Sequence, residues 1–317
     1  MSYHDDDRRA PPLPKPYAFV PLPDTVATAR PAGHERFRHH AGVLYFTLLA
    51  RSPVHVASGL LEQTRDRKYP LIKAHFRVAG RPVIPATSLK GCVRAIVEAI
   101  SPSAVTGARR DQVPPQYQPS RPQDGLDPAQ RIFGALGYQG HVAFSDATLE
   151  EGNTTVVPTP QLFTPRRQAT ATYYNGSMPK GRKFYMHGAL AEGDLPLEAC
   201  PAGSRFGCRM EFDNLTAGEL GLLLLALGLG EPRLWPKLGG AKPACLGTVE
   251  VTEARLELRD LRAAYTDFDS APAAVADLAP FLAAARDEGL LLEPQLRQLA
   301  EVLRWPREDR ECPDRSY

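Results

Sequence analysis

Four stretches of the chain carry the apolar patterns of buried or half-buried β-strands. Residues 43–49 form a short run rich in β-branched and aromatic side chains, which is typical of a buried strand. Residues 141–144 and 248–258 alternate between apolar and polar positions, and residues 204–212 have the composition and length of another strand. We expect these stretches to contribute to one sheet.

The spacing of apolar residues predicts a helix that begins near residue 87. Thr87 or Ser88, after a proline, is the expected N-cap. The apolar positions are Leu89, Val93, Ile96, Val97 and Ile100. Lys90 and Arg94 lie four residues apart on one side of this helix, near its start. They either complete a phosphate site at the helix N-terminus or are two solvated cations of an ordinary amphipathic helix.

Four further helices are expected. Their ranges are 128–133, 216–229, 272–285 and 293–303. The first should end at Gly134, and the second has an unusually apolar face and should be mostly buried. Pro280 should kink or split the third.

Residues 1–40 should form an extended arm, because they hold seven of the 31 prolines and proline disfavours helix. A purely solvated linker would not need the side chains of Tyr17, Phe19 and Val20. We expect these side chains to dock on a globular body, either that of the same chain or that of a neighbour.

Residues 156–187 have the pattern of two extended arms about a turn at Asn175-Gly176, a dipeptide typical of hairpins. The order of elements is strand, basic loop, helix, strand, hairpin, strand, helix, glycine-rich loop and strand. This order predicts an α+β fold with a ferredoxin-like sheet. The expected divisions are an arm (1–40), a core (41–260) with insertions at 51–85 and 152–191, and an acidic helical tail (261–317).

The composition is that of a globular protein, with 43% hydrophobic and 23% charged residues among 317. The longest apolar run, residues 220–229, is about half of what a membrane span needs, and the N-terminus does not have the pattern of a secretory signal. We therefore expect a cytoplasmic protein without membrane association. The five cysteines include no CxxC pair, so their spacing predicts neither a disulfide framework nor a zinc knuckle.

Charge is distributed unevenly although the net charge is only +2. Residues 250–317 hold 15 acidic and 9 basic residues, whereas residues 51–110 hold 11 Lys or Arg and three acids. Residues 152–191 hold five cations and no acid. Such a distribution is expected of a surface that meets a polyanion, although two solvated basic loops would give it as well.

Motifs of several enzyme classes are absent. The sequence contains no GxxxxGK[ST] phosphate loop, no GxSxG and no HExxH. His34, His39 and His40 are close in sequence, but adjacent histidines point in different directions on most backbones. We therefore expect no metal and no cofactor.

Four segments together resemble the RAMP superfamily, the RNA-binding proteins of CRISPR effector complexes. The first reads IPATSLKG at residues 84–91, followed by Arg94, and the second reads IFG at 132–134, followed by VAFSDA at 142–147. The third is the glycine-rich loop at residues 238–249. The fourth comprises residues 16–23 and 180–187, which are similar to segments of a type III-D-like branch.

This resemblance implies an RRM-like core with a thumb-like hairpin insertion, acting as a backbone subunit. Copies would bind a crRNA head to tail, present it to target RNA, and assemble with other CRISPR effector subunits. The proline-rich arm would then dock on the adjacent copy. From the charge pattern and the resemblance together, the expected RNA-binding residues are Arg65, Arg67, Lys68, Lys73, Thr87, Ser88, Lys90, Arg94, Arg166, Arg167, Lys180, Arg182, Lys183, Tyr185, His187 and Lys242.

One departure from the family pattern concerns cleavage. Cleaving members carry an aspartate in an Asp-x-Pro context upstream of the first motif, where this sequence has Lys68-Tyr69-Pro70. We therefore expect a subunit that binds without cutting, with cleavage left to another copy type or to a separate nuclease, as in type VII-like systems. The alternatives are a target-RNA endonuclease that uses Asp66 or His187, and an RRM-like RNA binder outside CRISPR defence.

Overall fold

An eight-stranded sheet forms the centre of the computed structural model, which describes residues 13–106, 113–162, 170–267 and 269–314. From edge to edge its path runs through β18 (Ala273–Val275), β17 (Val249–Leu258), β2 (His40–Ala50), β16 (Arg205–Leu215), β10 (Ala147–Glu151), β6 (Arg81–Ile84) and β5 (Arg77–Val78). Strand β9 (Val142–Phe144) pairs with β16 beside β10. The four expected strands are confirmed as β2, β9, β16 and β17, and all their pairings are antiparallel.

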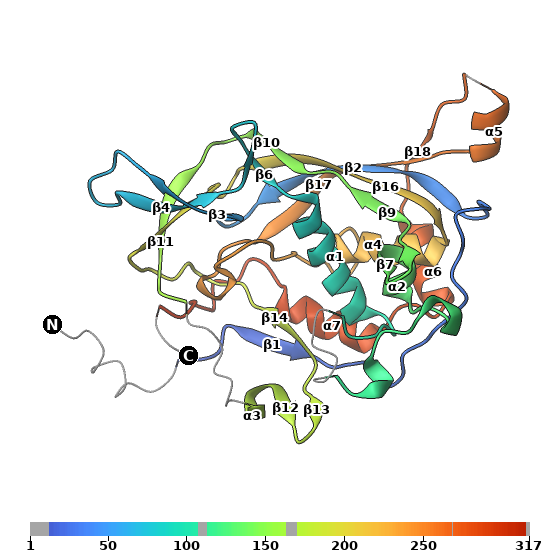
Figure 1. Cartoon of the computed structure of the whole chain (residues 1–317), viewed down its shortest axis with the longest axis horizontal. Helices are drawn as coiled ribbons and strands as arrows, with labels where there is room; N and C mark the ends of the chain where they lie inside the picture. The colour runs from blue at the N-terminus through green and yellow to red at the C-terminus, as the bar shows by residue number, and fades with distance from the viewer. Residues whose placement is uncertain (1–12, 107–112, 163–169, 268, 315–317) are drawn as a thin grey trace.

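Helices cover one face of this sheet (Figure 1). Helix α1 (Ala86–Ile100) contacts α2 (Pro128–Phe133), α4 (Ala217–Ala226) and α7 (Glu293–Val302), while α4 also contacts α6 (Ala279–Asp287). The predicted apolar face of α1 is buried, and its side chains join those of β2 and β16 in the core. The mixed α+β class expected from the element order is thereby confirmed.

The start of α1 differs from the expectation. The helix begins at Ala86 with Pro85 as N-cap, and neither Thr87 nor Ser88 caps it. Instead, the Ala86 amide donates a hydrogen bond of 2.7 Å to Oδ1 of Asp146, at the end of the VAFSDA segment. A distant carboxylate thus takes the role that the sequence assigned to a local hydroxyl.

Helix α4 is buried on all sides, as its composition indicated. Thr216 caps it, since its side chain accepts from the Glu219 amide while the Glu219 carboxylate accepts from the Thr216 amide. The short helix α2 is likewise capped by Asp127 and ends at Gly134, where φ is +97°.

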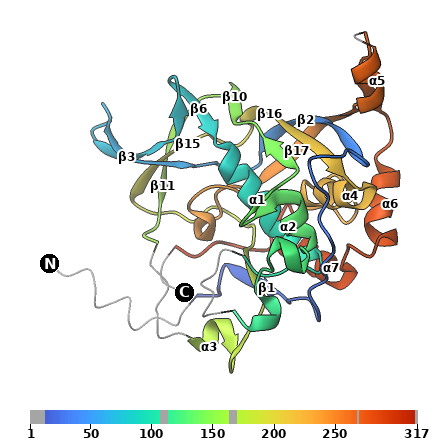
Figure 2. The ribbon, with the colours of Figure 1, turned by 45° about the vertical axis from the view of Figure 1, so that its right-hand side comes forward.

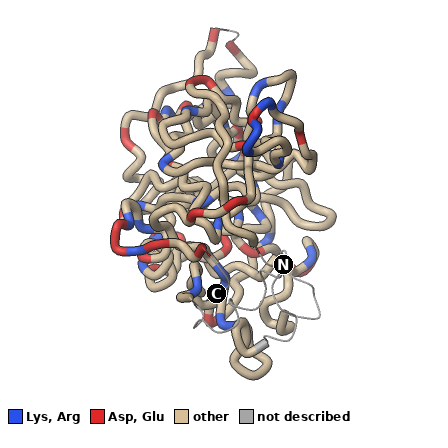
Figure 3. The backbone as a smooth tube through the Cα atoms, turned by 90° about the vertical axis from the view of Figure 1, so that its left-hand side faces the viewer, with Lys and Arg blue, Asp and Glu red and all other residues tan. Residues whose placement is uncertain are grey.

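Strands from the predicted insertions at 51–85 and 152–191, together with one strand beyond the second of them, form a second sheet of four strands. Its order is β11 (Thr155–Thr159), β15 (Leu195–Ala199), β4 (Leu71–His75) and β3 (Ala57–Gln63), with β15 and β4 parallel. The β3–β4 hairpin projects at one end of the molecule (Figure 1). Basic and acidic positions are both spread over this end (Figure 3).

The prediction of one long hairpin over residues 156–187 is wrong for the residues that the structure describes. Strand β11 pairs with β15, whereas β14 (Arg182–Tyr185) pairs with β1 (Tyr17–Val20) of the N-terminal arm. The turn after Asn175 joins only two very short strands, β12 (Tyr174–Asn175) and β13 (Met178–Pro179), which follow α3 (Thr170–Tyr173). The turn dipeptide therefore predicted a local reversal correctly, but it did not determine which strands pair.

The proline-rich arm docks on the body of its own chain. In β1, Tyr17 and Val20 are buried, and the strand lies on the helical side of the main sheet, beside α7 (Figures 1 and 2). Docking of Tyr17, Phe19 and Val20 is thus confirmed, and a neighbouring copy is not needed to cover these side chains.

The tail contains α5 (Leu261–Thr266), β18, α6 and α7. Residues 273–275 are a strand instead of the start of the predicted helix, and Pro280 lies in the first turn of α6, where its missing amide hydrogen costs nothing. Cys245 and Cys312 form a disulfide, which the cysteine spacing had not indicated. Among the residues described, no helix combines the length and apolar character needed to cross a membrane.

Five short elements complete the fold. They are β7 (Gly134–Ala135), β8 (Tyr138–Gln139) and the 3-10 turns η2 (Pro115–Tyr117), η3 (Pro122–Asp124) and η4 (Lys242–Ala244). Of these, η4 belongs to the glycine-rich loop.

Candidate RNA-binding site

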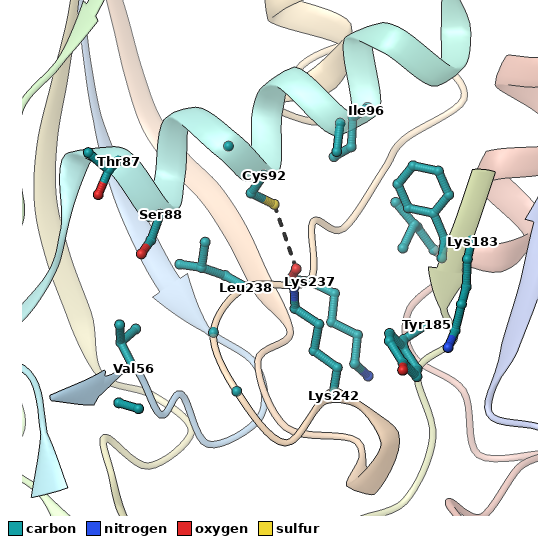
Figure 4. A pocket seen from close by; sticks show the side chains of 17 residues that line it. Val56, Thr87, Ser88, Cys92, Ile96, Lys183, Tyr185, Lys237, Leu238 and Lys242 are labelled. Atoms are coloured by element: carbon teal, nitrogen blue, oxygen red, sulfur yellow. Dashed lines mark hydrogen bonds between the residues drawn. The ribbon is translucent and has the colours of Figure 1, made fainter. Parts of the chain in front are cut away.

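A cavity of about 450 Å³ lies between the first half of α1, strand β14 and the glycine-rich loop (Figure 4). Its lining combines three of the segments that carry the family resemblance, which are far apart in sequence. Three lysines line it, Lys183, Lys237 and Lys242, and none of the described aspartates and glutamates does. The cavity is therefore a place where positive charge collects without a carboxylate to neutralise it.

Helix α1 lines this cavity with a face of small side chains. Thr87, Gly91 and Ala95 are exposed along one side of α1 at four-residue spacing, and all three line the cavity, as does Ser88. Small side chains leave the helix backbone accessible, and the two hydroxyl groups can donate hydrogen bonds to an anion. Thr87 and Ser88, two of the predicted RNA-binding residues, thus both line the cavity.

The glycine-rich loop is held against the segment between β2 and β3. The Gly240 amide donates a hydrogen bond of 2.7 Å to the His55 carbonyl. At Gly239, where φ is +81°, a Cβ atom would lie 2.3 Å from the same carbonyl oxygen. A side chain at Gly239 would therefore force the loop away from this wall, which explains the glycine there.

Lys237 is the most unusual of the three lysines. Its side chain is only 6% exposed, and its ammonium group donates a hydrogen bond of 2.8 Å to the Met186 carbonyl. Burial, with smaller contributions from Arg310 and Lys242, lowers the pKa of Lys237 to about 7. The sequence analysis did not select this residue, although it directly precedes the glycine-rich segment.

Lys183 lies among aromatic rings. Its Nζ atom is 4.0 Å from the ring centroid of Tyr17 and 4.7 Å from that of Tyr185. Burial lowers the pKa of Lys183. Both Lys183 and Tyr185 line the cavity, so the basic and aromatic residues predicted for this segment do lie together (Figure 4). Lys180 lies outside it and donates to the Ala171 carbonyl.

Lys90 and Arg94 do not form the predicted open phosphate site. Lys90 donates a 3.0 Å hydrogen bond to the Val142 carbonyl, and burial lowers its pKa. Arg94 donates to the buried Glu98 carboxylate at 2.9 Å and to the Gly134 carbonyl at 3.1 Å. These two cations hold α1 to neighbouring segments.

Arg182, like Arg94, pairs with the buried Glu98 carboxylate. Its guanidinium donates a 2.6 Å hydrogen bond to the second oxygen of Glu98, so that this one buried carboxylate joins α1 to β14. Since most of the Arg182 side chain is covered, its charge is used inside the protein.

His187 is 0% exposed, which contradicts both roles suggested for it. Its Nδ1 atom lies 2.8 Å from the Thr248 hydroxyl and its Nε2 atom 3.0 Å from the Trp235 carbonyl. Burial and nearby cations lower its pKa to about 3. A neutral, fully covered imidazole can neither exchange protons with RNA near neutral pH nor touch it.

The remaining basic candidates lie on the β3–β4 hairpin. Arg65, Arg67, Lys68 and Lys73 are exposed. Asp66 is also exposed, and its Oδ1 atom accepts a hydrogen bond of 2.8 Å from the Lys68 amide, which closes the turn. Val56 and Ala57 at the base of the hairpin line the cavity, so the hairpin extends from the cavity rim.

Two candidates could not be placed, because Arg166 and Arg167 lie outside the described residues. Lys242, another predicted RNA-binding residue, lies at the start of η4 and lines the cavity.

The face of the main sheet opposite the helices has a different character. Its arginines are paired with glutamates: Arg205 with Glu253 at 2.5 Å, Arg209 with Glu211 at 3.0 Å, and Arg255 with Glu257. This face offers charges that are already in ion pairs, whereas no described carboxylate forms an ion pair with the three lysines of the cavity.

A family model described as the RAMP superfamily matches residues 47–250. That range includes α1, the VAFSDA segment, β14 and the glycine-rich loop, and so all of the cavity lining except Leu303. No curated protein matches the chain. Because the family model covers more than half of the sequence and the elements that build the cavity, the chain belongs to the RAMP superfamily.

Proposed function

We propose that this protein is a crRNA-binding backbone subunit of a CRISPR ribonucleoprotein, which presents the guide for pairing with target RNA without cutting it. Membership of the RAMP superfamily supports a CRISPR-associated RNA-binding role. We place the RNA-binding site in the cavity between α1, β14 and the glycine-rich loop, because three lysines line this cavity and none of the described carboxylates does.

The strand order supports an RRM-like core. Strands β17, β2, β16 and β9–β10 lie side by side, and α1 and α4 fall between β2 and β9 and between β16 and β17 in the chain. This is the βαββαβ arrangement of ferredoxin-like folds. The segment between β10 and β16, which contains β11 to β15, takes the place of the thumb-like insertion.

The cavity suits the sugar–phosphate backbone of RNA better than the open face of the sheet does. Phosphate binding releases counterions only where the protein cations are available. The hydroxyl groups of Thr87 and Ser88, which line the same cavity as Lys237 and Lys242, provide hydrogen-bond donors as well. On the open face, each phosphate would first have to displace a glutamate from its arginine.

The geometry favours binding over cleavage. Asp66 closes the turn of an exposed hairpin, and the imidazole of His187 is covered. Incubating the guide complex with labelled target RNA tests this directly. An intact target supports a binder, whereas cuts that disappear in Asp66→Ala would establish the endonuclease.

Assembly in head-to-tail copies and contacts with other effector subunits belong to the same proposal. Strand β1 pairs with β14 of its own chain, so these four residues are already used within the protein and are not free to contact the next copy. The exposed apolar side chains of Leu60 and Leu61 on edge strand β3 are a better candidate for that contact.

The RNA site is tested by fluorescence anisotropy with a labelled guide RNA at several salt concentrations. Lys242→Ala should weaken binding and reduce the slope of log K against log salt by about one. Arg209→Ala, on the open face, serves as the matched control and should change neither quantity. If Arg209→Ala weakens binding and Lys242→Ala does not, the RNA lies on the sheet, as expected of an RRM-like binder outside CRISPR defence.

A further inference from the structure

Three potential metal ligands, His34, His141 and Asp213, come together where β9 begins and β16 ends. The Nδ1 atom of His141 lies 2.5 Å from Oδ1 of Asp213, and the Nδ1 atom of His34 lies 3.6 Å from the same oxygen. All three donor atoms lie within 4.8 Å of one another. They come from the arm, from the residue before β9, and from β16.

The second nitrogen of each histidine is committed to hydrogen-bond donation. Nε2 of His34 lies 3.1 Å from the Gln139 carbonyl, which can only accept. Nε2 of His141 lies 2.7 Å from the Tyr138 hydroxyl, and that hydroxyl donates its own proton to the Ala32 carbonyl at 2.8 Å. Both histidines therefore carry hydrogen on Nε2.

A neutral imidazole with hydrogen on Nε2 presents a lone pair at Nδ1. In His34 and His141 both lone pairs would then face the carboxylate oxygen of Asp213. Two lone pairs and a negative oxygen repel one another unless a positive charge lies between them. That charge is either a proton on one of the rings or a cation that all three atoms bind.

We propose that His34, His141 and Asp213 bind a divalent transition-metal ion, with Zn²⁺ as the best-fitting candidate. Imidazole and carboxylate are ligands that suit Zn²⁺. Hydrogen bonds from the second nitrogen of each histidine to a carbonyl or hydroxyl are the usual outer contacts of such ligands.

The separation of His34 from Asp213 suits one ion, whereas His141 and Asp213, at 2.5 Å, have to move apart to bind it. Ligands at about 2.0 Å around tetrahedral zinc lie about 3.3 Å apart, close to the distance from His34 to Asp213. The Asp213 side chain is 42% exposed and can move away from His141, while His34, at 36%, leaves further coordination positions open to solvent.

The surroundings hold the three ligands in place. The Asn214 side chain accepts from the Arg38 amide at 2.8 Å and donates to the Gly33 carbonyl at 2.8 Å, which fixes the arm segment around His34. The Asp213 amide donates to the His141 carbonyl at 3.1 Å. A metal here would join the arm to the main sheet.

Zinc titration of the full-length, chelator-treated protein tests the proposal, together with Co²⁺ absorption spectra. The wild type should bind one Zn²⁺ per chain, melt at a higher temperature with the ion, and give a Co²⁺ spectrum without a thiolate band. His34→Ala and Asp213→Asn should bind at least about 100-fold more weakly. His39→Ala, an exposed histidine on the same segment, is the matched control and should behave as the wild type.

Two results would overturn the proposal. If the wild type neither binds Zn²⁺ nor melts differently with it, the charge between the rings is a proton. If His34→Ala and Asp213→Asn bind Zn²⁺ as tightly as the wild type does, the ion lies elsewhere. The Co²⁺ spectrum separates a site on the free cysteines from this one, because only thiolates give the charge-transfer band.

Discussion

Replacing Lys237 with methionine should remove most of the pH dependence of guide binding. The pKa of Lys237 is lowered to about 7 because its ammonium group is buried beside other cations. A phosphate in the cavity would favour the charged form, so RNA binding should be accompanied by proton uptake by Lys237 above pH 7. Methionine fills a similar volume and cannot take up a proton.

The size of the effect follows from the pKa. With a pKa of about 7, about three quarters of the Lys237 side chains are charged at pH 6.5, but only about 3% at pH 8.5. If the bound form stays charged, guide affinity should fall roughly 25-fold between these two values. RNA phosphates do not titrate in this range, so the change reports on the protein.

Stability should respond in the opposite direction. Below pH 7 Lys237 is charged in both the folded and the unfolded chain, and burial then disfavours the folded state. Between about pH 7 and about 10.4 the unfolded chain binds the proton and the folded one does not, so stability rises with pH across that window. The full difference corresponds to roughly 5 kcal/mol. In Lys237→Met this contribution should be absent.

The assay is fluorescence anisotropy with labelled guide RNA at pH 6.5 and 8.5 and constant ionic strength. Lys242→Ala is the control, because it removes a cation of the cavity and leaves Lys237 in place, so the ratio of the affinities at the two pH values should stay that of the wild type. The reasoning fails if the wild type binds equally well at both pH values. It also fails if the affinity of Lys237→Met depends on pH as strongly as that of the wild type, since groups other than Lys237 would then cause the dependence.

Three further predictions concern the contacts that hold the cavity walls together. Glu98→Ala leaves Arg94 and Arg182 without their buried carboxylate and should lower the free energy of unfolding in urea by about 3 kcal/mol. Arg304→Ala breaks an exposed pair with Asp309 and should lower it by less than about 1 kcal/mol. Equal losses in the two variants would show that the ion pairs of Glu98 add nothing to stability. Reducing the Cys245–Cys312 disulfide, whose cysteines are 67 residues apart, should destabilise the protein by about 4 kcal/mol. The melting temperature of Cys312→Ser should not change when the reductant is added. If the reductant leaves the melting temperature of the wild type unchanged, the prediction is wrong. Deleting residues 1–24 removes β1 and should lower both the melting temperature and the guide affinity. A deletion variant that melts and binds guide RNA as the wild type does would refute the role of this strand.

Local patterns predicted the elements of this fold well, because each pattern is decided within a few residues. The apolar run of β2, the apolar face of α1, the end of α2 at Gly134 and the burial of α4 are all as expected. Pairing between segments was harder to predict. Nothing near β14 indicates that its partner is β1, since the choice depends on side chains more than 150 residues away.

The same distinction applies to the candidate site. Lys183, Tyr185 and Lys242 were selected for charge and aromatic character, and they do line the cavity. Arg94 and Arg182 were selected for the same reason, yet both point to the buried Glu98. A sequence shows that a residue is cationic, but whether a carboxylate neutralises it depends on the tertiary fold.

The pairing of β1 with β14 also bears on how the protein folds. Contacts between residues far apart in the chain form late, because a long loop must close before they gain anything. The main sheet and its helices do not depend on this two-stranded ribbon for their own pairings. We therefore expect the ribbon to dock after the rest is assembled and to detach first under stress, so that the cavity can lose a wall while the body beneath stays intact.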